Sequence, residues 1–361
     1  MRVCKLKPKA HFHLGDKEAV LEKTSDYIHS DTLFSAICNA YRLLYGNEGL
    51  QDVLKLFEDR EPPFLISSAF LYAGKILTFP LPLSINWDNY VDDEVIEGLN
   101  AERKENEKVD KFSLLKRLKR VKFVSEKIFW NVTEEESRIK DYINESNIVQ
   151  GILFSDEELE RLRKQLGVVE EENEDIRIIN RREVPRVAID RRANVSHIYH
   201  FGEVSFAKGC GLYFMMDMRK REYEREVKAA IRILGDEGIG GDRTCGKGLF
   251  KAKCESKDMD MNLKSANHFV TLSLYYPMKE ELKSMENSYY ELIRRGGWIY
   301  SLDAMDIRRR VVRMFSEGSV FQTVNGRELY GGMADVKPKG FEKHGVYRYG
   351  FAFAVPLVKQ R

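Results

Sequence analysis

The chain has 361 residues, a length that suits two domains, and its 43% hydrophobic and 11% aromatic content is typical of a globular protein. Its 59 basic and 57 acidic residues give a formal net charge of +2. This balance excludes a uniformly basic nucleic-acid coat, but it is compatible with a local basic face.

The cysteines and the hydropathy of the sequence indicate in which cellular compartment the protein is expected. The five cysteines form no CxxC pair and are odd in number, so we expect neither a disulfide framework nor a cysteine zinc site, and we expect a reducing compartment. The N-terminus has no continuous apolar segment of the signal-peptide type. The most apolar window, residues 64–83, is interrupted by Lys75, Pro80 and Pro82. We therefore expect a cytoplasmic protein without a membrane span.

The first elements predict a β-α-β order. Residues 2–14 alternate in character and indicate a strand. Apolar residues then recur at helical spacing from Ser30 to Gly46, where Ser30 or Asp31 can cap the helix and Gly46 can end it. Residues 64–83 predict paired strands with a turn at Ala73–Gly74.

Residues 88–180 differ from the rest of the chain. Between residues 133 and 176 there are 14 acidic and 5 basic residues. We interpret this segment as a long, helical and solvated insertion outside the core. A structural spacer is favoured over an arm that docks a partner.

The strand character returns after the insertion. Residues 179–206 predict a hairpin that turns at "DRRAN", and residues 211–218 predict a further strand. A helix over 219–235, with Gly235 as its C-terminal cap, precedes a glycine-rich loop and a strand over 249–255. Without the insertion the order is β-α-β-β-α-β, which is a ferredoxin-like unit.

A second unit is predicted from Asn267 onward. It contains a strand over 268–277, a helix over 279–297 and further strands toward the C-terminus. The predicted fold is therefore α+β, with two ferredoxin-like (RRM-like) units in tandem. The predicted domains are residues 1–258, which include the insertion, and residues 259–361.

The loop "GIGGDRTCGKG", residues 238–248, resembles a phosphate-binding loop. Gly241, Gly246 and Lys247 satisfy the spacing G-x-x-x-x-G-K, but Gly248 replaces the magnesium-binding Ser or Thr. A helix precedes the loop and a strand follows it, whereas a P-loop runs from strand to helix. These differences argue against nucleotide hydrolysis.

The same loop can instead hold a phosphodiester chain. Glycines allow close approach of the backbone, Arg243 offers a forked contact to phosphate, Lys247 a point charge and Thr244 a hydroxyl. The alternative is a tight connection between helix and strand that needs glycine for steric reasons.

Local charge favours RNA as the ligand. Residues 181–251 contain 15 basic and 10 acidic residues, and aromatic residues at 199 and 201 interleave with them. Cations position a nucleic-acid backbone, while aromatic and guanidinium planes stack on unpaired bases. The basic residues that flank the predicted hairpin are Arg181, Arg182, Arg186, Arg191 and Arg192.

Five ordered segments resemble a known family. "GIGGDRTCGKGLF" resembles the glycine-rich loop of the RAMP superfamily of CRISPR proteins. "HSDTLFSAICNAY", "VPRVAIDRRAN", "GLYFMMDM" and "MFSEGSVF" resemble its branch of fourth Csm subunits from type III-A effector complexes. The resemblance runs from His11 to about Pro356 and skips the insertion.

This resemblance implies a subunit that holds the repeat-derived 5′ handle of the guide RNA (crRNA) and has no catalytic centre or cofactor. It also implies two protein partners, the large polymerase-like subunit and a backbone subunit of the filament. The handle-contacting residues that it implies are Ser30, Asp31, Arg191, Arg192, Gly240, Gly241, Arg243, Thr244, Gly246, Lys247 and Gly248.

Catalysis is the alternative, because some RAMP relatives are metal-independent endoribonucleases that cut guide precursors. Such chemistry needs a base for the 2′-OH and an acid for the leaving oxygen. The candidates are Tyr27, His29, His11 and His13, although local packing or capping explains each of them more simply. A metal site is not expected, since the only closely spaced pair after the insertion, at 197 and 200, does not share one strand face.

Overall fold

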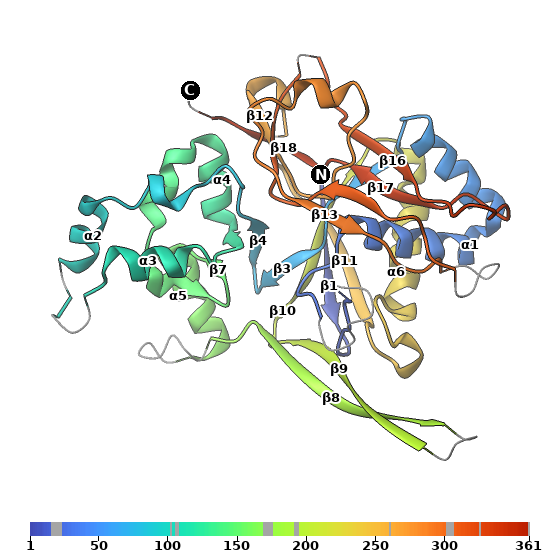
Figure 1. Cartoon of the computed structure of the whole chain (residues 1–361), viewed down its shortest axis with the longest axis horizontal. Coiled ribbons are helices and arrows are strands. Elements are labelled where there is room, and N and C mark those ends of the chain that lie inside the picture. Colours follow the sequence, from blue (N-terminus) through green and yellow to red (C-terminus); the bar gives the residue numbers. More distant parts are fainter. Residues whose placement is uncertain are drawn as a thin grey trace.

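The structure, a computed structural model, describes residues 1–15, 24–101, 103–104, 108–168, 176–190, 195–259, 261–300, 307–324 and 326–359. Its fold is mixed α+β (Figure 1).

A large mixed sheet forms the centre of the molecule. In the described part of the chain it has nine strands, in the order β11-β1-β10-β3-β4-β5-β7-β6, with β2 paired to β10 off this path. The neighbours pair antiparallel except β5 and β7, which are parallel. The strands are β1 (Arg2–Pro8), β2 (Phe64–Ile66), β3 (Phe70–Ala73), β4 (Ile76–Pro80), β5 (Phe123–Ser125), β6 (Ile148–Val149), β7 (Ile152–Leu153), β10 (Cys210–Met218) and β11 (Phe250–Ser256).

The helices α1 (Ser30–Glu58) and α6 (Glu224–Glu237) pack against each other. Helix α1 breaks at Gly46, whose φ of 73° is a left-handed value, so the predicted stop is confirmed as a break after which the helix resumes. Helix α6 continues past its predicted cap at Gly235. A Cβ at this position would lie 2.6 Å from a carbonyl oxygen of β11, so the glycine allows the helix to approach the sheet closely.

The insertion belongs to the core, and the interpretation of a solvated segment outside it is wrong. Its strands β5, β7 and β6 extend the main sheet. Side chains such as Leu118, Phe129 and Leu162 are fully buried in the same hydrophobic cluster as the sheet, because the helices turn their apolar faces inward. The helices are α2 (Asp93–Asn100), α3 (Lys111–Leu118), α4 (Glu126–Glu134) and α5 (Asp156–Leu166).

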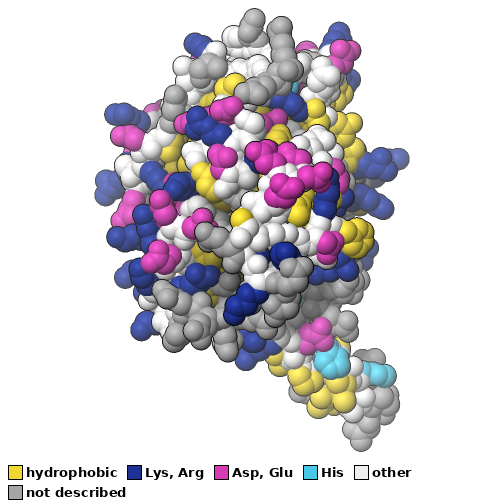
Figure 2. Space-filling view, turned by 90° about the vertical axis from the view of Figure 1, so that its left-hand side faces the viewer, with side chains coloured by type: hydrophobic (Ala, Val, Ile, Leu, Met, Phe, Trp, Pro, Cys, Tyr) yellow, Lys and Arg dark blue, Asp and Glu magenta, His cyan; other side chains and the backbone are white. Residues whose placement is uncertain are grey.

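The outer face of the insertion is not a uniformly acidic surface. Figure 2 shows Lys and Arg side chains interspersed with Asp and Glu over this face. The insertion also meets the end of the chain, where the Val358 N–H donates to the carbonyl oxygen of Thr133 at 2.8 Å. The insertion is therefore a subdomain that is joined to the rest of the fold.

The predicted hairpin is confirmed. The strands β8 (Ile179–Asp190) and β9 (Val195–Phe206) pair antiparallel along their full length and project from the body (Figure 1). The turn at 191–194, with the predicted site residues Arg191 and Arg192, lies outside the described residues.

The described residues of the C-terminal part form three small sheets, β15-β12-β18, β13-β14 and β16-β17. Its strands are β12 (His268–Thr271), β13 (Leu292–Arg295), β14 (Val312–Phe315), β15 (Val320–Gln322), β16 (Gly331–Asp335), β17 (Tyr347–Phe351) and β18 (Ala354–Leu357).

The predicted helix over 279–297 is wrong. A short 3-10 helix, Glu281–Ser284, is followed by β13, because the backbone at Tyr289 exchanges two hydrogen bonds with Val320 and is drawn into sheet pairing. Helix α1, and not the predicted helix, packs against the strands of the C-terminal part. Its Phe34 contacts Tyr349 of β17, with the ring centroids 5.0 Å apart. One hydrophobic cluster thus crosses the predicted boundary at 258, and the two-domain division stays a prediction.

One disulfide joins Cys4 to Cys254 across β1 and β11. The sequence-based expectation of no disulfide framework did not anticipate this single bond. Cys38, Cys210 and Cys245 are free. Within the described ranges, every helix is too short or too polar to cross a lipid bilayer.

Candidate nucleic-acid interface

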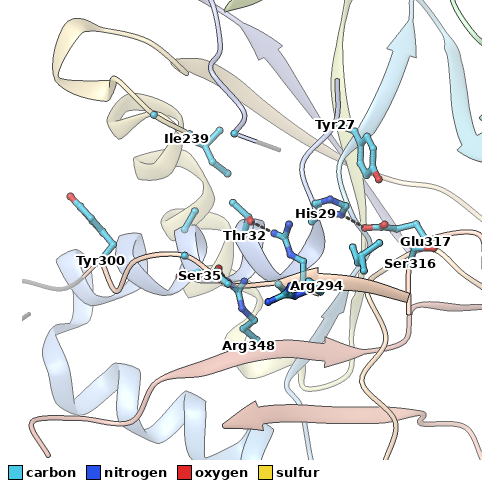
Figure 3. Close-up of a pocket in the computed structure, with 18 of the residues that line it drawn as sticks. Tyr27, His29, Thr32, Ser35, Ile239, Arg294, Tyr300, Ser316, Glu317 and Arg348 are labelled. Atoms are coloured by element: carbon cyan, nitrogen blue, oxygen red, sulfur yellow. Dashed lines mark hydrogen bonds and ion pairs between the residues drawn. The ribbon is translucent and has the colours of Figure 1, made fainter. Parts of the chain in front are cut away.

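A cavity of about 1750 Å³ lies where three segments meet. The first turns of α1, the glycine-rich loop and the segment that follows β13 all line it. Figure 3 shows Tyr300 at one end of this cavity and the pair of His29 and Glu317 at the other, with Arg294 and Arg348 between them. Residues distant in sequence are thus brought into one site.

The lining of the cavity is basic, with three glutamates, Glu237, Glu291 and Glu317, against seven lysines and arginines. The basic residues are Arg42, Lys122, Arg243, Arg294, Arg295, Arg309 and Arg348.

Three of the cavity arginines, Arg42, Arg294 and Arg309, have no ion-pair partner among the described residues. Burial, reinforced by the charge of Arg348, lowers the pKa of Arg309 to about 10. An anion in the cavity would relieve this unfavourable environment, since an opposite charge favours the protonated form.

Asp31 is buried below the cavity and holds two of its arginines. The Arg295 guanidinium donates to both carboxylate oxygens at 2.8 and 3.0 Å, and Arg348 also forms an ion pair with the carboxylate. Burial alone would raise the pKa of Asp31, but the two arginines outweigh it and hold the pKa well below its usual range. The hydroxyl of Ser30 accepts the N–H of Leu274 at 3.0 Å.

Ser30 and Asp31 are therefore internal residues, with 0% and 1% exposure. The expectation that they contact RNA directly does not fit this burial. Their contacts join α1 to the C-terminal part and position the arginines above them.

At the far end of the cavity His29 and Glu317 form a pair, with Nδ1 and Oε1 2.9 Å apart. Glu317 also accepts a hydrogen bond from the hydroxyl of Ser68. Burial would raise the pKa of Glu317, yet the neighbouring His29 and this hydrogen bond lower it. Glu317 is therefore ionised at neutral pH.

The glycines allow the loop to pack closely against its neighbours, which agrees with the alternative that the tight connection between helix and strand needs glycine for steric reasons. The N–H of Gly241 donates to the carbonyl oxygen of His13 at 2.9 Å, and that of Gly248 donates to His11 at 2.8 Å. A Cβ on Gly240 would lie 2.3 Å from the carbonyl oxygen of His13. The loop thus rests against residues 11–14, and the N–H groups of Gly241 and Gly248 are not free for a phosphate.

The two cations of the loop have different environments. Lys247 Nζ lies 2.7 Å from the buried carboxylate of Glu203, which also binds Arg182. Arg243 instead lines the cavity, and its guanidinium stacks over the ring of Tyr300, with the guanidinium carbon 4.6 Å from the ring centroid. Arg243 is the loop cation that faces the site.

Thr244 and Gly246 lie beside Arg243 in the short 3-10 turn and its cap, outside the cavity lining. The histidines proposed for catalysis are separated, because His13 is buried against Phe201 while His11 contacts Arg182. The described residues contain no group of three or more His, Cys, Asp or Glu that could hold a metal.

Sequence reasoning found the loop side of the cavity but missed the opposite side. The missed residues include Arg294 and Arg295 of β13, which the predicted helix over 279–297 concealed, and Arg309, which precedes β14. The signals that could have found them are the runs "RRGGW" at 294–298 and "RRR" at 308–310.

Comparisons with known proteins cover nearly the whole chain. The profile of the RAMP superfamily matches residues 5–251, and that of the CRISPR Csm4 C-terminal domain matches residues 264–357. The chain is 27% identical to the CRISPR system Cms protein Csm4 of Methanocaldococcus jannaschii, over 100% of this chain and 99% of the relative. It is 28% identical to the protein of that name from Thermococcus onnurineus, over 91% of both chains.

Two solved structures share the fold. A chain in the crystal structure of a Csm3–Csm4 subcomplex of the type III-A interference complex is similar with a TM-score of 0.66 and 22% identity, over 99% of this chain and 100% of that one. A chain of a Csm1–Csm4 cassette in complex with AMPPNP is similar with a TM-score of 0.57 and 21% identity, over 100% and 99%.

Proposed function

Because the chain belongs to the RAMP superfamily, in its Csm4 branch, we propose that it is a non-catalytic RNA-binding subunit of a type III-A CRISPR ribonucleoprotein. In this role it holds the 5′ handle of the guide RNA. The observation that carries the proposal is the basic cavity, which Arg243 of the glycine-rich loop lines together with Arg294 and Arg309, two arginines without an ion-pair partner in the described part of the chain. Several arginines lining one cavity suit a phosphodiester chain, because each arginine can bind a phosphate through two N–H groups.

The order of strands supports the expected architecture. Strands β11, β1, β10 and β3 lie side by side, with α1 and α6 in the two β-α-β connections. We propose that they form the first ferredoxin-like unit, that the C-terminal sheets form an abbreviated second one, and that the RNA lies where the two meet.

The proposed partners are a large polymerase-like subunit and a backbone subunit. The solved structures with this fold are of Csm1–Csm4 and Csm3–Csm4 assemblies, and the matched regions cover both halves of this chain. Co-expression with tagged large and backbone subunits, followed by size-exclusion chromatography, tests this. A chain that elutes apart from both subunits would contradict the proposal.

The RNA-binding proposal is tested by salt dependence. We expect the double variant Arg243→Ala, Arg294→Ala to weaken binding of a repeat-derived single-stranded RNA and to reduce the slope of log K against log salt by about 0.7 for each phosphate that the protein no longer neutralises. Fluorescence anisotropy over a range of salt concentrations measures both.

The matched control is Lys116→Ala combined with Arg117→Ala, which also removes two positive charges, from exposed positions on α3 outside the cavity lining. If the double variant and this control bind RNA equally well, the cavity does not hold the RNA backbone.

An endoribonuclease is the second candidate, because the pair of His29 and Glu317 lines the same cavity as Tyr27. A carboxylate on Nδ1 can orient an imidazole for general base catalysis. The same pair also fixes the start of α1 to the C-terminal part, and we favour this structural role. Incubation with repeat RNA in EDTA decides, since cleavage that disappears in His29→Ala would establish the enzyme.

A further inference from the structure

The strand-like segment after β13 exposes two aromatic rings at the cavity. Exposure alternates along it, with Trp298 53% and Tyr300 63% exposed while Ile299 between them is buried. The segment is held in place, because the Ile299 N–H donates to the carbonyl oxygen of Ile307 at 2.8 Å and Trp298 pairs with Arg308 in an antiparallel bridge. Both rings thus lie on the same side of a fixed segment.

An arginine covers one face of each ring. The guanidinium carbon of Arg308 lies 4.7 Å from the ring centroid of Trp298, and that of Arg243 lies 4.6 Å from the ring centroid of Tyr300. The cations orient the rings through cation–π attraction, and the high exposure of both rings leaves further ring surface in contact with solvent. A single exposed ring is ordinary on a protein surface, but two exposed rings on one side of a segment that lines a cavity indicate a binding surface.

We propose that Trp298 and Tyr300 form a stacking platform for unpaired nucleobases. This inference rests on the proposed RNA-binding function and adds the part of the ligand that the rings contact. Both side chains line the cavity that also contains Arg294 and Arg309. Exposed aromatic rings close to several cations are the combination that binds single-stranded nucleic acid, since the bases stack on the rings while the phosphates contact the arginines.

A protein partner is the competing occupant, because Trp, Tyr and Arg are also enriched at the centres of protein interfaces. The surroundings favour RNA. The rings lie at a concave, basic site, and Arg243, which lies against the ring of Tyr300, also lines the cavity and can contact phosphate there.

The test compares RNA with an abasic strand of the same length and charge. For the full chain with Trp298→Ala or Tyr300→Ala, we expect RNA affinity to fall by about 5- to 150-fold for each base that loses its stacking. Affinity for the abasic strand should change little. Trp298→Phe and Tyr300→Phe should retain most of the RNA affinity, because phenylalanine also stacks.

Phe112→Ala on α3 is the matched control, since this ring is 77% exposed and lies outside the cavity lining. Tryptophan fluorescence gives an independent signal. Trp87 is buried and Trp130 packs against the core, so quenching by RNA should be lost in Trp298→Phe and absent with the abasic strand.

Three outcomes would overturn the inference. Equal losses for RNA and the abasic strand would show that the rings act through the arginines. Unchanged RNA affinity, with arginine variants still weakening it, would refute the platform while the proposed function stands. Unchanged RNA affinity together with loss of binding to the large or backbone subunit would identify a protein interface instead. If the arginine variants also bind RNA normally, the proposed function itself fails.

Discussion

Substitution of Asp31 by Asn tests whether the buried ion cluster joins the two parts of the chain. The Asp31 side chain has no exposed surface, and those of Arg348 and Arg295 are 5% and 13% exposed. Asn keeps the shape but removes the charge, so two guanidinium groups remain buried without their counterion. Removing one partner of a buried ion pair costs about 3–5 kcal/mol, and we expect a loss of this size in the free energy of unfolding.

Urea unfolding followed by circular dichroism and by tryptophan fluorescence measures this loss. The control is Asp236→Asn, which breaks an exposed pair with Lys9 whose side chains are 73% and 49% exposed and should cost less than about 1 kcal/mol. If Asp31→Asn costs no more than this control, the cluster does not hold the parts together.

The stabilisation that Asp31 provides should depend on pH in a definite direction. Since the arginines lower the pKa of Asp31 in the folded state, its contribution is complete above the ordinary value of 3.8 and is lost as the pH falls below it. The difference in unfolding free energy between the wild type and Asp31→Asn should be constant from pH 5 to 8 and shrink below pH 4. A difference that grows on acidification would contradict the assignment.

Two further predictions concern the glycine-rich loop and the disulfide. Gly248→Ala should lower the free energy of unfolding by about 2–4 kcal/mol, because the new Cβ would lie 2.1 Å from a carbonyl oxygen and the backbone φ is 72°. The control Gly246→Ala has a φ of 77° but open space around its Cβ, so it should cost about 1 kcal/mol. Similar urea midpoints for the two variants would refute the packing role of Gly248. Thiol titration of the oxidised protein in denaturant should detect three free cysteines, and five would show that Cys4 and Cys254 are not bonded.

The sequence was most informative where local pattern and local structure agree. The hairpin at 179–206 and the helix at 224–237 follow from alternation and helical spacing, which the structure retains. The sequence also revealed Arg243, because an arginine among glycines is unusual enough to be noticed.

The errors arose where tertiary contacts override local pattern. Residues 279–297 have helical composition, but β-pairing of residues 292–295 with β14 and of Tyr289 with Val320 determines their conformation. The acidic composition of the insertion concealed apolar faces that meet the main sheet. The burial of Ser30 and Asp31 could not be predicted, because the partners of Asp31, Arg295 and Arg348, lie more than 260 residues away in the sequence.

The position of the RNA on the protein tests the central claim most directly. Ultraviolet crosslinking of a photoreactive repeat-derived RNA to the full chain, followed by mass spectrometry, locates the contacts. We expect crosslinked peptides to contain residues 238–250 and 291–300, on the two sides of the cavity. Crosslinks restricted to the insertion helices, with neither peptide modified, would contradict this account.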